Sequence, residues 1–291
     1  MKLRKLKDSD NAVVGIVAAF LIVGLVVSVL AVVQTQYVPQ WMKEKEANHM
    51  NIVADQFAQL KYAMDIHSTS KEKNTPITST ITLGSKEMPY MLSTRAYGHL
   101  EILQGDFNIT LDPRDELLDE VLYELGMIKY SSYNAYYINQ EFIYQAGAVI
   151  LKQDLGNITY IKPSFSVDFL ENVTINFKII DVATVGNKDK SEQGFGPAPI
   201  QTEFISTTNT YEVQNISNMS INTSYTNAWH QFLNNTLRKA YLNYNGYATN
   251  YSIEVNDEEG FVKVEFHDTV TVNFEVEVVK IGAQIAPGWV E

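Results

Sequence analysis

The pattern of apolar and polar positions divides the chain into a short N-terminal apolar segment and a long region of alternating character. Residues 12–33 carry no charge and are almost entirely apolar. A helix of this length, at about 1.5 Å per residue, crosses the roughly 30 Å hydrocarbon core of a bilayer. Every face of such a helix is apolar, so the pattern favours a transmembrane helix over the core helix of a soluble domain.

Residues 34–76 predict a helical stalk and a loop. Pro39 suits the first turn of a new helix better than a helix interior. From Gln40 to about Ile66, apolar side chains recur at helical spacing, namely Met42, Met50, Val53, Phe57, Leu60 and Met64. This stripe predicts packing either against the rest of the chain or against other subunits in a filament or bundle. The polar stretch 67–76 predicts the loop.

Residues 77–291 predict a mainly β domain. The clearest strand is 269–279, in which Val270, Val272, Phe274, Val276 and Val278 alternate with polar residues. This alternation indicates one buried and one solvated face. Further strands are predicted at 77–83, 142–151, 172–180 and 261–266, and on either side of a turn at Gly105-Asp106.

Two helical patterns interrupt the strands. Leu117, Leu118, Val121, Leu122 and Leu125 predict a short amphipathic helix that Gly126 ends. A second helix is predicted from Trp229 to Tyr241, with Ser224 or Thr226 as its N-cap. Residues 186–198 predict a loop or linker. The expected fold is therefore a mainly β, sandwich-like ectodomain with one or two short helices, on an N-terminal hydrophobic α-helix and an amphipathic helical stalk.

The distribution of charge predicts the topology. Lys+Arg 22 against Asp+Glu 34 give a net charge of -12, but Lys2, Arg4, Lys5 and Lys7 all precede the apolar segment. The positive-inside rule then predicts a cytoplasmic basic leader (1–11), a transmembrane helix (12–33), the stalk and loop (34–76) and an extracellular β-rich domain (77–291) at the cell membrane. A removable signal peptide, cleaved after Ala31, is the alternative, although the apolar run exceeds its usual length.

Composition and motifs exclude several functions. The chain has no cysteine, which removes disulfides, thiol catalysis and zinc fingers. Its acidity disfavours nucleic acid as a partner. We find no zinc-protease, nucleophile-elbow or phosphate-binding motif, and the five histidines are scattered. The acidic residues between Asp112 and Glu124 could attract calcium, but they lack the spacing of an EF-hand. No catalytic, cofactor-binding or metal-binding residue is therefore assigned, and we expect no enzyme.

Asparagine sequons are the strongest compositional signal. With 23 Asn and 38 Ser and Thr in 291 residues, chance predicts about three Asn-x-Ser/Thr sequons. The chain has eight, all beyond the apolar segment, at Asn108, Asn157, Asn172, Asn215, Asn218, Asn222, Asn234 and Asn250. The excess predicts a glycosylated, externally facing surface. The alternative is that these residues simply form turns and edge strands.

Residues 8–61, from DSDNAVVGIV to NIVADQFAQLK, resemble the N-terminus of archaeal type IV pilin-like proteins. Together with 81–102 and 281–291, they also resemble a group of membrane-anchored archaeal surface proteins that has no assigned chemistry. The pilin likeness implies a leader that is removed ahead of the apolar helix, which then packs in a filament core. The sequence departs from the pilin pattern because Asp8, Ser9, Asp10 and Asn11 separate the basic residues from Ala12.

Three functions remain open at this stage. The first is a pilin-like structural or adhesive surface protein, anchored or polymerised through its apolar helix. The second is a non-polymerising single-pass module that binds envelope sugars, ions or proteins. The third is an exported hydrolase, although no pair of carboxylates suited to acid–base chemistry can be identified. The expected partners are the lipid bilayer, through residues 12–33, and either further copies of the chain or other envelope proteins.

Overall fold

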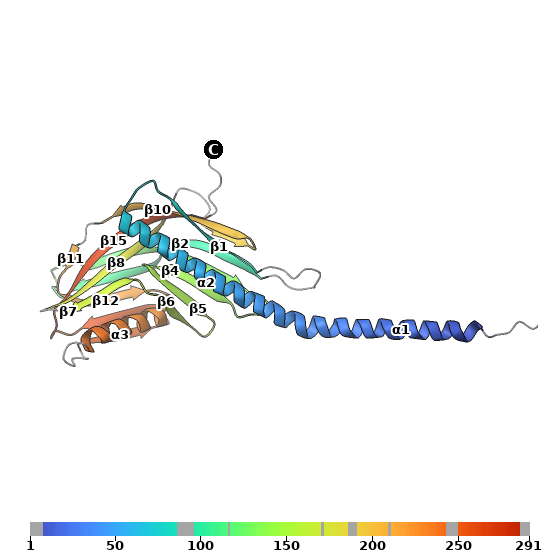
Figure 1. Ribbon diagram of the computed structural model, residues 1–291. Helices are drawn as coiled ribbons and strands as arrows, with labels where there is room; N and C mark the ends of the chain where they lie inside the picture. The colour runs from blue at the N-terminus through green and yellow to red at the C-terminus, as the bar shows by residue number, and fades with distance from the viewer. Residues whose placement is uncertain are drawn as a thin grey trace, which may run out of the picture.

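A long helix projects from a β-rich domain in the computed structural model (Figure 1). The structure describes residues 8–85, 96–115, 117–169, 172–185, 191–208, 211–242 and 250–285. The predicted fold class is confirmed, because two curled sheets follow one N-terminal helical segment.

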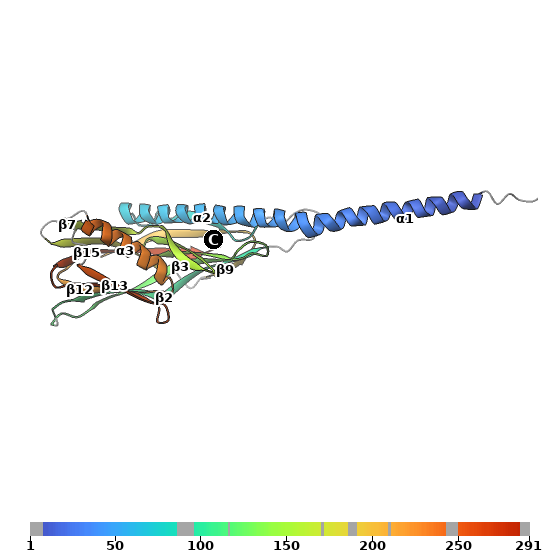
Figure 2. The ribbon, with the colours of Figure 1, turned by 90° about the horizontal axis from the view of Figure 1, so that it is seen from below.

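The helical segment runs without a break from α1 (Asp8–Val32) through a π-helical turn, η1 (Val33–Tyr37), into α2 (Val38–Ser70). In the π turn the N–H of Val38 donates to the carbonyl of Val33, five residues earlier. Pro39 lies directly after this turn. The wider hydrogen-bonded loop of the π turn accommodates both the missing N–H of proline and its pyrrolidine ring. Pro39 therefore lies in the first turn of α2, as the sequence predicts, although the π turn joins α1 to α2 without a break. It coincides with the slight bend between α1 and α2 seen in Figure 2.

The strands form two sheets. The six-stranded sheet has the order β1-β10-β15-β8-β7, with β11 also paired to β15. Its strands are β1 (Ile77–Thr82), β10 (Pro197–Thr207), β15 (Val272–Ile285), β8 (Val173–Thr184), β7 (Ser164–Phe169) and β11 (Tyr211–Val213). β8 and β15 pair in parallel, with Val173 opposite Val272.

The nine-stranded sheet is antiparallel in the order β13-β14-β12-β2-β3-β4-β5-β6, with β9 also paired to β2. Its strands are β13 (Tyr251–Asn256), β14 (Phe261–Phe266), β12 (Ile216–Asn222), β2 (Tyr97–Pro113), β3 (Val121–Tyr133), β4 (Gln140–Gln145), β5 (Ala148–Gln153), β6 (Gly156–Ile161) and β9 (Ser191–Gly194). The predicted C-terminal helix is α3 (Thr226–Leu242).

Two hydrophobic cores fill the domain, and the long strands contribute to both. The α3 core contains the buried face of α3, and the α2 core contains the buried face of α2. β8 gives Val173, Ile175, Phe177 and Ile179 to the α3 core, and then Ile180 and Val182 to the α2 core. β15 likewise contributes Val272, Phe274 and Val276 to the α3 core, and then Val279 and Ile281 to the α2 core. Because neighbouring residues on a strand face opposite sides, each of these strands buries one face in each core.

β3 crosses β8 at a glycine. A Cβ added at Gly126 would overlap the carbonyl oxygen of Val182, so only glycine permits this close approach. The N–H of Gly126 donates to Asp181 Oδ1 at 3.0 Å. The predicted helix ended by Gly126 is therefore wrong. Residues 121–133 instead form β3 between β2 and β4, because pairing to two neighbouring strands overrides the local helical spacing.

Other local predictions are wrong as well. The loop predicted at 67–76 begins only after Ser70, where α2 ends, and residues 186–198 are not all loop, because β9 spans Ser191–Gly194 and β10 begins at Pro197. Gly105-Asp106 is not a turn between two strands but a bulge within β2, where the register shifts between Gln104 and Phe107. Gly105 has φ +82°, a conformation that glycine adopts without strain. Residues 142–151 are not one strand, because β4 and β5 form a hairpin with Ala146 and Gly147 at the turn, both at positive φ.

Candidate functional site

The apolar helix is exposed along its length. Every side chain from Val13 to Val32 is exposed, with Phe20 at 73% and Leu25 at 67%. Among the described residues, the continuous helix Val13–Ser70 is the one long and apolar enough to cross a membrane, and none of its most apolar window is buried. In the core helix of a soluble protein, most of this apolar stretch would be buried. α1 is therefore a candidate membrane anchor.

Two aromatic side chains follow the anchor. Tyr37 and Trp41 are exposed, and their ring centroids lie 5.7 Å apart. Tyrosine and tryptophan are enriched at the membrane–water interface, where an apolar ring and a polar group are both satisfied. Val38 and Met42, one residue further along in each case, are already buried. The change from lipid-compatible surface to protein contact is thus completed within about two helical turns.

A buried carboxylate fixes the start of α2 to the β domain. Glu46 is fully buried, and its Oε1 accepts a hydrogen bond from the N–H of Ala135 at 3.1 Å. Its Oε2 accepts from the N–H groups of Tyr136 and Tyr137, both at 2.7 Å. These three amides belong to the connection between β3 and β4. Hydrogen bonds of this kind are strong because the acceptor is charged, so they fix the position of the helix relative to the sheet.

Two buried histidines hold α2 to the six-stranded sheet. His49 Nε2 donates to the carbonyl of Thr82 in β1 at 2.9 Å, and His67 Nε2 donates to the carbonyl of Thr202 in β10 at 3.0 Å. Burial lowers the pKa of both imidazoles below the ordinary value, and the hydrogen bonds to Thr82 and Thr202, with nearby Glu46 and Glu203, offset only part of this effect. Both rings therefore favour the neutral state, in which Nε2 carries the proton that each contact requires.

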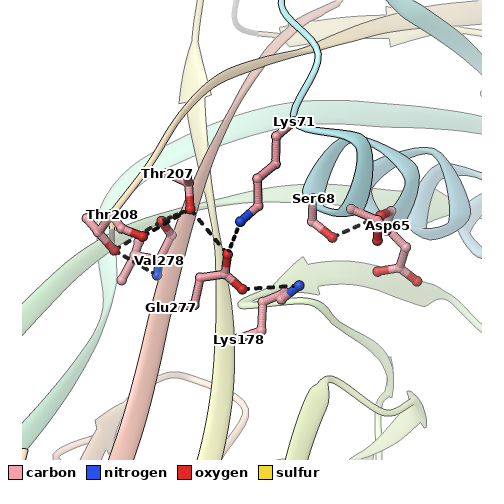
Figure 3. A network of polar contacts seen from close by, with 9 residues as sticks. Asp65, Ser68, Lys71, Lys178, Thr207, Thr208, Glu277 and Val278 are labelled. Carbon is pink, nitrogen blue, oxygen red and sulfur yellow. Dashed lines mark hydrogen bonds and ion pairs between the residues drawn. The ribbon is translucent and has the colours of Figure 1, made fainter. Parts of the chain in front are cut away.

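An ion-pair network secures the far end of α2 (Figure 3). Lys71, just after the helix, lies 2.6 Å from Glu277 Oε1, and Lys178 lies 3.1 Å from Glu277 Oε2. Burial alone would raise the pKa of the Glu277 carboxyl, but the hydrogen bonds from the two lysines outweigh it and lower that pKa. Thr207 Oγ1 also donates to this carboxylate at 3.4 Å. The helix is therefore held to the domain along its full buried length.

Metal ligands were not expected from the sequence, and the described part of the chain was searched for them. There, no group of three or more His, Asp or Glu residues is arranged to hold a metal ion. The acidic stretch from Asp112 to Glu124 runs from the end of β2 through the connection into β3, with Glu116 outside the described residues. A cavity of about 300 Å³ lies between α2 and β1 beside Asn48, His49 and Ser85.

Three of the predicted sequon asparagines share one face of the nine-stranded sheet. Asn108 on β2 lies directly opposite Asn222 on β12, and Asn218 lies on the same side of β12. These residues alternate with buried Ile109, Met219 and Ile221, so they belong to the outer face. The other five are dispersed, with Asn157 on β6, Asn172 before β8, Asn215 before β12, Asn234 within α3 and Asn250 before β13.

The eight asparagines differ in their contacts. Asn172 and Asn222 are exposed. Asn157 instead supports α3, because its Oδ1 accepts a hydrogen bond from the N–H of Ala228 at 2.7 Å and its carbonyl accepts one from Asn227 Nδ2 at 2.7 Å. Asn157 thus satisfies one of the free amides at the start of α3. The sequence suggested Ser224 or Thr226 for the N-cap; the Thr226 hydroxyl donates to Asp257.

Sequence reasoning missed Glu46, although a signal was present. Glu46 lies four residues after Met42 and four before Met50, in the middle of the apolar stripe. A charged residue on the buried face of an amphipathic helix needs hydrogen-bonding partners. Which amides would supply them could not be read from the sequence, because the connection from β3 to β4 is 89–91 residues away.

Comparisons with protein families, with curated proteins and with solved structures give no match for this chain.

Proposed function

We propose that the protein is a pilin-like structural or adhesive surface protein, which displays its β domain outside the cell on a membrane-embedded helix. One observation carries the proposal: a single helix is exposed and apolar from Val13 to Val32 and is then buried on one face over α2. An exposed apolar helix of about 30 Å is unfavourable in water but suits lipid or the core of a filament. The fixed junction supports display in one orientation.

The charge distribution supports an extracellular β domain. The four basic residues Lys2, Arg4, Lys5 and Lys7 precede α1, and the chain from residue 34 onward has 18 basic and 32 acidic residues. Basic residues are retained on the cytoplasmic side of a membrane, so this asymmetry favours export of the acidic domain. In that location, exposed Asn172 and Asn222 are the sequons best placed to accept glycans. Asn157 is the least suited, because its side chain caps α3.

The location is tested with intact cells and isolated membranes. We expect the full chain to resist alkaline carbonate extraction and to be cut by a protease added outside intact cells. A variant with Leu21, Leu25 and Val29 all changed to Glu is the matched control, and we expect carbonate to release it. Release of the natural chain, or protection of its β domain in intact cells, would contradict the proposal.

The mature N-terminus separates the remaining alternatives. Sequencing of the protein recovered from cells gives a start near Ala12 if a pilin-type leader is removed, and a start near Val32 if the segment is a signal peptide. An intact leader indicates a permanent anchor. A start near Val32 would refute the proposal, because α1 would then be missing from the mature protein.

One observation favours a second function, a non-polymerising binding module. The cavity of about 300 Å³ beside His49 is large enough for a small ligand such as a monosaccharide. We would test it by calorimetric titration of the detergent-solubilised chain with envelope monosaccharides. Binding that is lost in Asn48→Ala but retained in Asn51→Ala, an exposed position on the same helix, would support this second function.

A further inference from the structure

Four segments of the chain meet at one end of the β domain. Tyr97 at the start of β2 lies opposite Tyr133 at the end of β3, and the two rings stack with their centroids 4.6 Å apart. The ring of Phe195, just after β9, lies 6.2 Å from that of Tyr97. The N–H of Leu83, just after β1, donates to the carbonyl of Gly196 at 2.9 Å. We call residues 83–85, 96–98, 133–139 and 194–196 the anchor-proximal end.

The anchor-proximal end is fixed beside the first turns of α2. Glu46 accepts its hydrogen bonds from three amides of this end, those of Ala135, Tyr136 and Tyr137. Glu46 follows Trp41 by five residues, which is about 7.5 Å along the helix axis. In Figure 1 the labelled strands lie along α2, and α1 projects beyond them. This end of the domain is therefore the one that lies close to the exposed aromatic pair after the anchor.

Protein contacts begin even closer to the apolar segment. Val38 is 1% exposed, whereas Val26 and Val32 of α1 are 48% and 46% exposed. A helix alone leaves a valine about half exposed, so other parts of the chain cover Val38. Val38 follows Val33, the last residue of the apolar run, by five residues or about 7.5 Å. The headgroup region on each side of a bilayer is roughly 5–8 Å thick, so the protein around α2 reaches the level of the headgroups.

The surface at this end is uncharged and rich in aromatic side chains. Its described residues include no Asp, Glu, Lys, Arg or His, although charged residues make up 19% of the chain. Tyr133, Ile138 and Phe195 are exposed, at 43%, 44% and 42%. Aromatic side chains are favoured at the membrane–water interface, and exposed apolar groups gathered in one place commonly mark an interaction surface. The anchor-proximal end therefore has the composition of a surface that contacts lipid.

The opposite end of the same strands has a different character. There β2 and β3 are joined by residues 114–120, which include four acidic residues and one arginine. Leu117 in this connection is 92% exposed, so an apolar side chain is also present, but it lies among carboxylates. Removing carboxylates from water costs much more free energy than removing uncharged groups. The two ends of the domain thus differ in the way that contact with a membrane at one end requires.

From these observations we infer that the anchor-proximal end lies in the headgroup region of the membrane that holds α1, with Tyr133, Ile138 and Phe195 against lipid. Transmembrane helices tilt by roughly 20° on average, and a tilt toward the domain brings this end closer to the lipid. Exposed Lys43 and Glu44 of α2 lie at the same level, where zwitterionic headgroups accommodate both signs of charge. The inference rests on the proposed function, because it requires that α1 lies in a membrane.

Single fluorophores on introduced cysteines test this contact without background, because the natural chain has no cysteine. Ile138→Cys reports on the anchor-proximal end, and Leu117→Cys at the opposite end is the matched control. Each variant of the full chain is labelled and placed in phosphatidylcholine vesicles that contain phosphatidylcholine with a spin label on its headgroup. We expect the spin label to remove most of the fluorescence at residue 138 and to leave that at residue 117 unchanged, because this quenching requires contact.

A third label separates failure of this inference from failure of the anchoring. Leu25→Cys lies in the middle of α1, and its fluorophore is tested with a spin label on the lipid acyl chain. Quenching at residue 25 without quenching at residue 138 would overturn the inference and leave the anchoring intact. No quenching at residue 25 would refute the anchoring itself. Equal quenching at residues 138 and 117 would also overturn the inference, because the domain would then have no preferred end at the membrane.

A charge placed on the same surface supplies a second measurement. Ile138→Glu, with the fluorophore moved to exposed Asn139→Cys, should lower headgroup quenching about two- to fivefold, because it removes an apolar contact and adds a charge near the interface. Leu117→Glu with the same fluorophore should leave the quenching unchanged. Equal quenching with Ile138 and with Ile138→Glu would overturn the inferred lipid contact. Thermal unfolding of each variant verifies that the domain itself is unchanged.

Discussion

α1 and α2 are parts of one continuous helix, yet their side chains meet different surroundings. Phe20 in α1 is 73% exposed, whereas Phe57 in α2 is fully buried. From Ala12 onward α1 is apolar on every face, and α2 has one apolar face and one polar face. The comparison shows that backbone hydrogen bonding, which the two parts share, does not determine where a helix lies. The distribution of side chains around its axis does.

The largest expected effect separates the packing of α2 from that of α1. Phe57→Ala leaves a cavity in the α2 core and should lower the free energy of unfolding of the β domain by about 3–5 kcal/mol. Phe20→Ala is the matched control and should leave that free energy unchanged, because its side chain touches no part of the domain. Denaturant unfolding of the full chain in detergent, followed by tryptophan fluorescence, measures both. A similar loss in the two variants would contradict the division of the helix.

The next largest effect is expected from a change in α1, with a change in α2 as the control. Leu25→Arg places a charge in the middle of the apolar segment and should disfavour membrane insertion by about 2.5–3.5 kcal/mol. Tyr62→Arg, at an exposed position of α2, should leave insertion unchanged. Carbonate extraction of membranes gives the bound fraction of each variant. Retention of Leu25→Arg at the natural level would show that α1 does not lie in the bilayer core.

A smaller effect is expected at the junction itself. Glu46→Gln removes the charge that three amides share and should lower the free energy of unfolding by about 1–3 kcal/mol, because an amide group satisfies those donors poorly. Glu44→Gln, which is exposed two residues earlier, should change it by less than about 0.5 kcal/mol. Thermal unfolding distinguishes the two, and equal behaviour would mean that the carboxylate does not hold the helix.

The smallest effect concerns pH. His49 and His67 have a lowered pKa in the folded chain, so below their ordinary value near 6.5 the unfolded chain binds more protons. Stability of the β domain should therefore decrease as the pH falls from about 7.5 toward 5. His67→Gln should flatten part of this dependence, since its amide can still donate to Thr202. Melting temperatures across that range test the sign, and a constant value would contradict it.

Much of the fold could be predicted where burial follows a local period. β1, β14 and α3 lie close to their predicted positions, because each turns one face toward the core and the other toward solvent along the element. The predictions failed where a strand buries both faces or crosses another strand. Leu117 to Leu125 fits a helical stripe, yet β2 and β4 pair with this region from Val121 onward. The adjacent apolar pairs Ile179-Ile180 and Val278-Val279 mark the change of core, but this meaning is visible only with both sheets in place.

The candidate site was predictable only in part, for the same reason. The apolar anchor needs no tertiary contact, so residues 12–33 predicted it directly. The face of α2 followed from the spacing of Met42, Phe57 and Met64, and their burial selects packing against the β domain from the two alternatives. The sequons could be counted from the sequence, but not sorted into exposed Asn222 and helix-capping Asn157.

The sequence by itself determined the apolar helix, the charge asymmetry around it and the β character of the remainder, because these depend on composition and local period. Only the tertiary structure decided that Pro39 lies within one continuous helix, that Gly126 is the crossing point of two sheets and that Glu46 is held by amides of a distant connection. Whereas the turn at Pro39 rests on a local hydrogen bond from Val38 to Val33, the features at Gly126 and Glu46 depend on contacts between residues far apart in the chain. Such contacts form when the two cores close, and no local pattern specifies them.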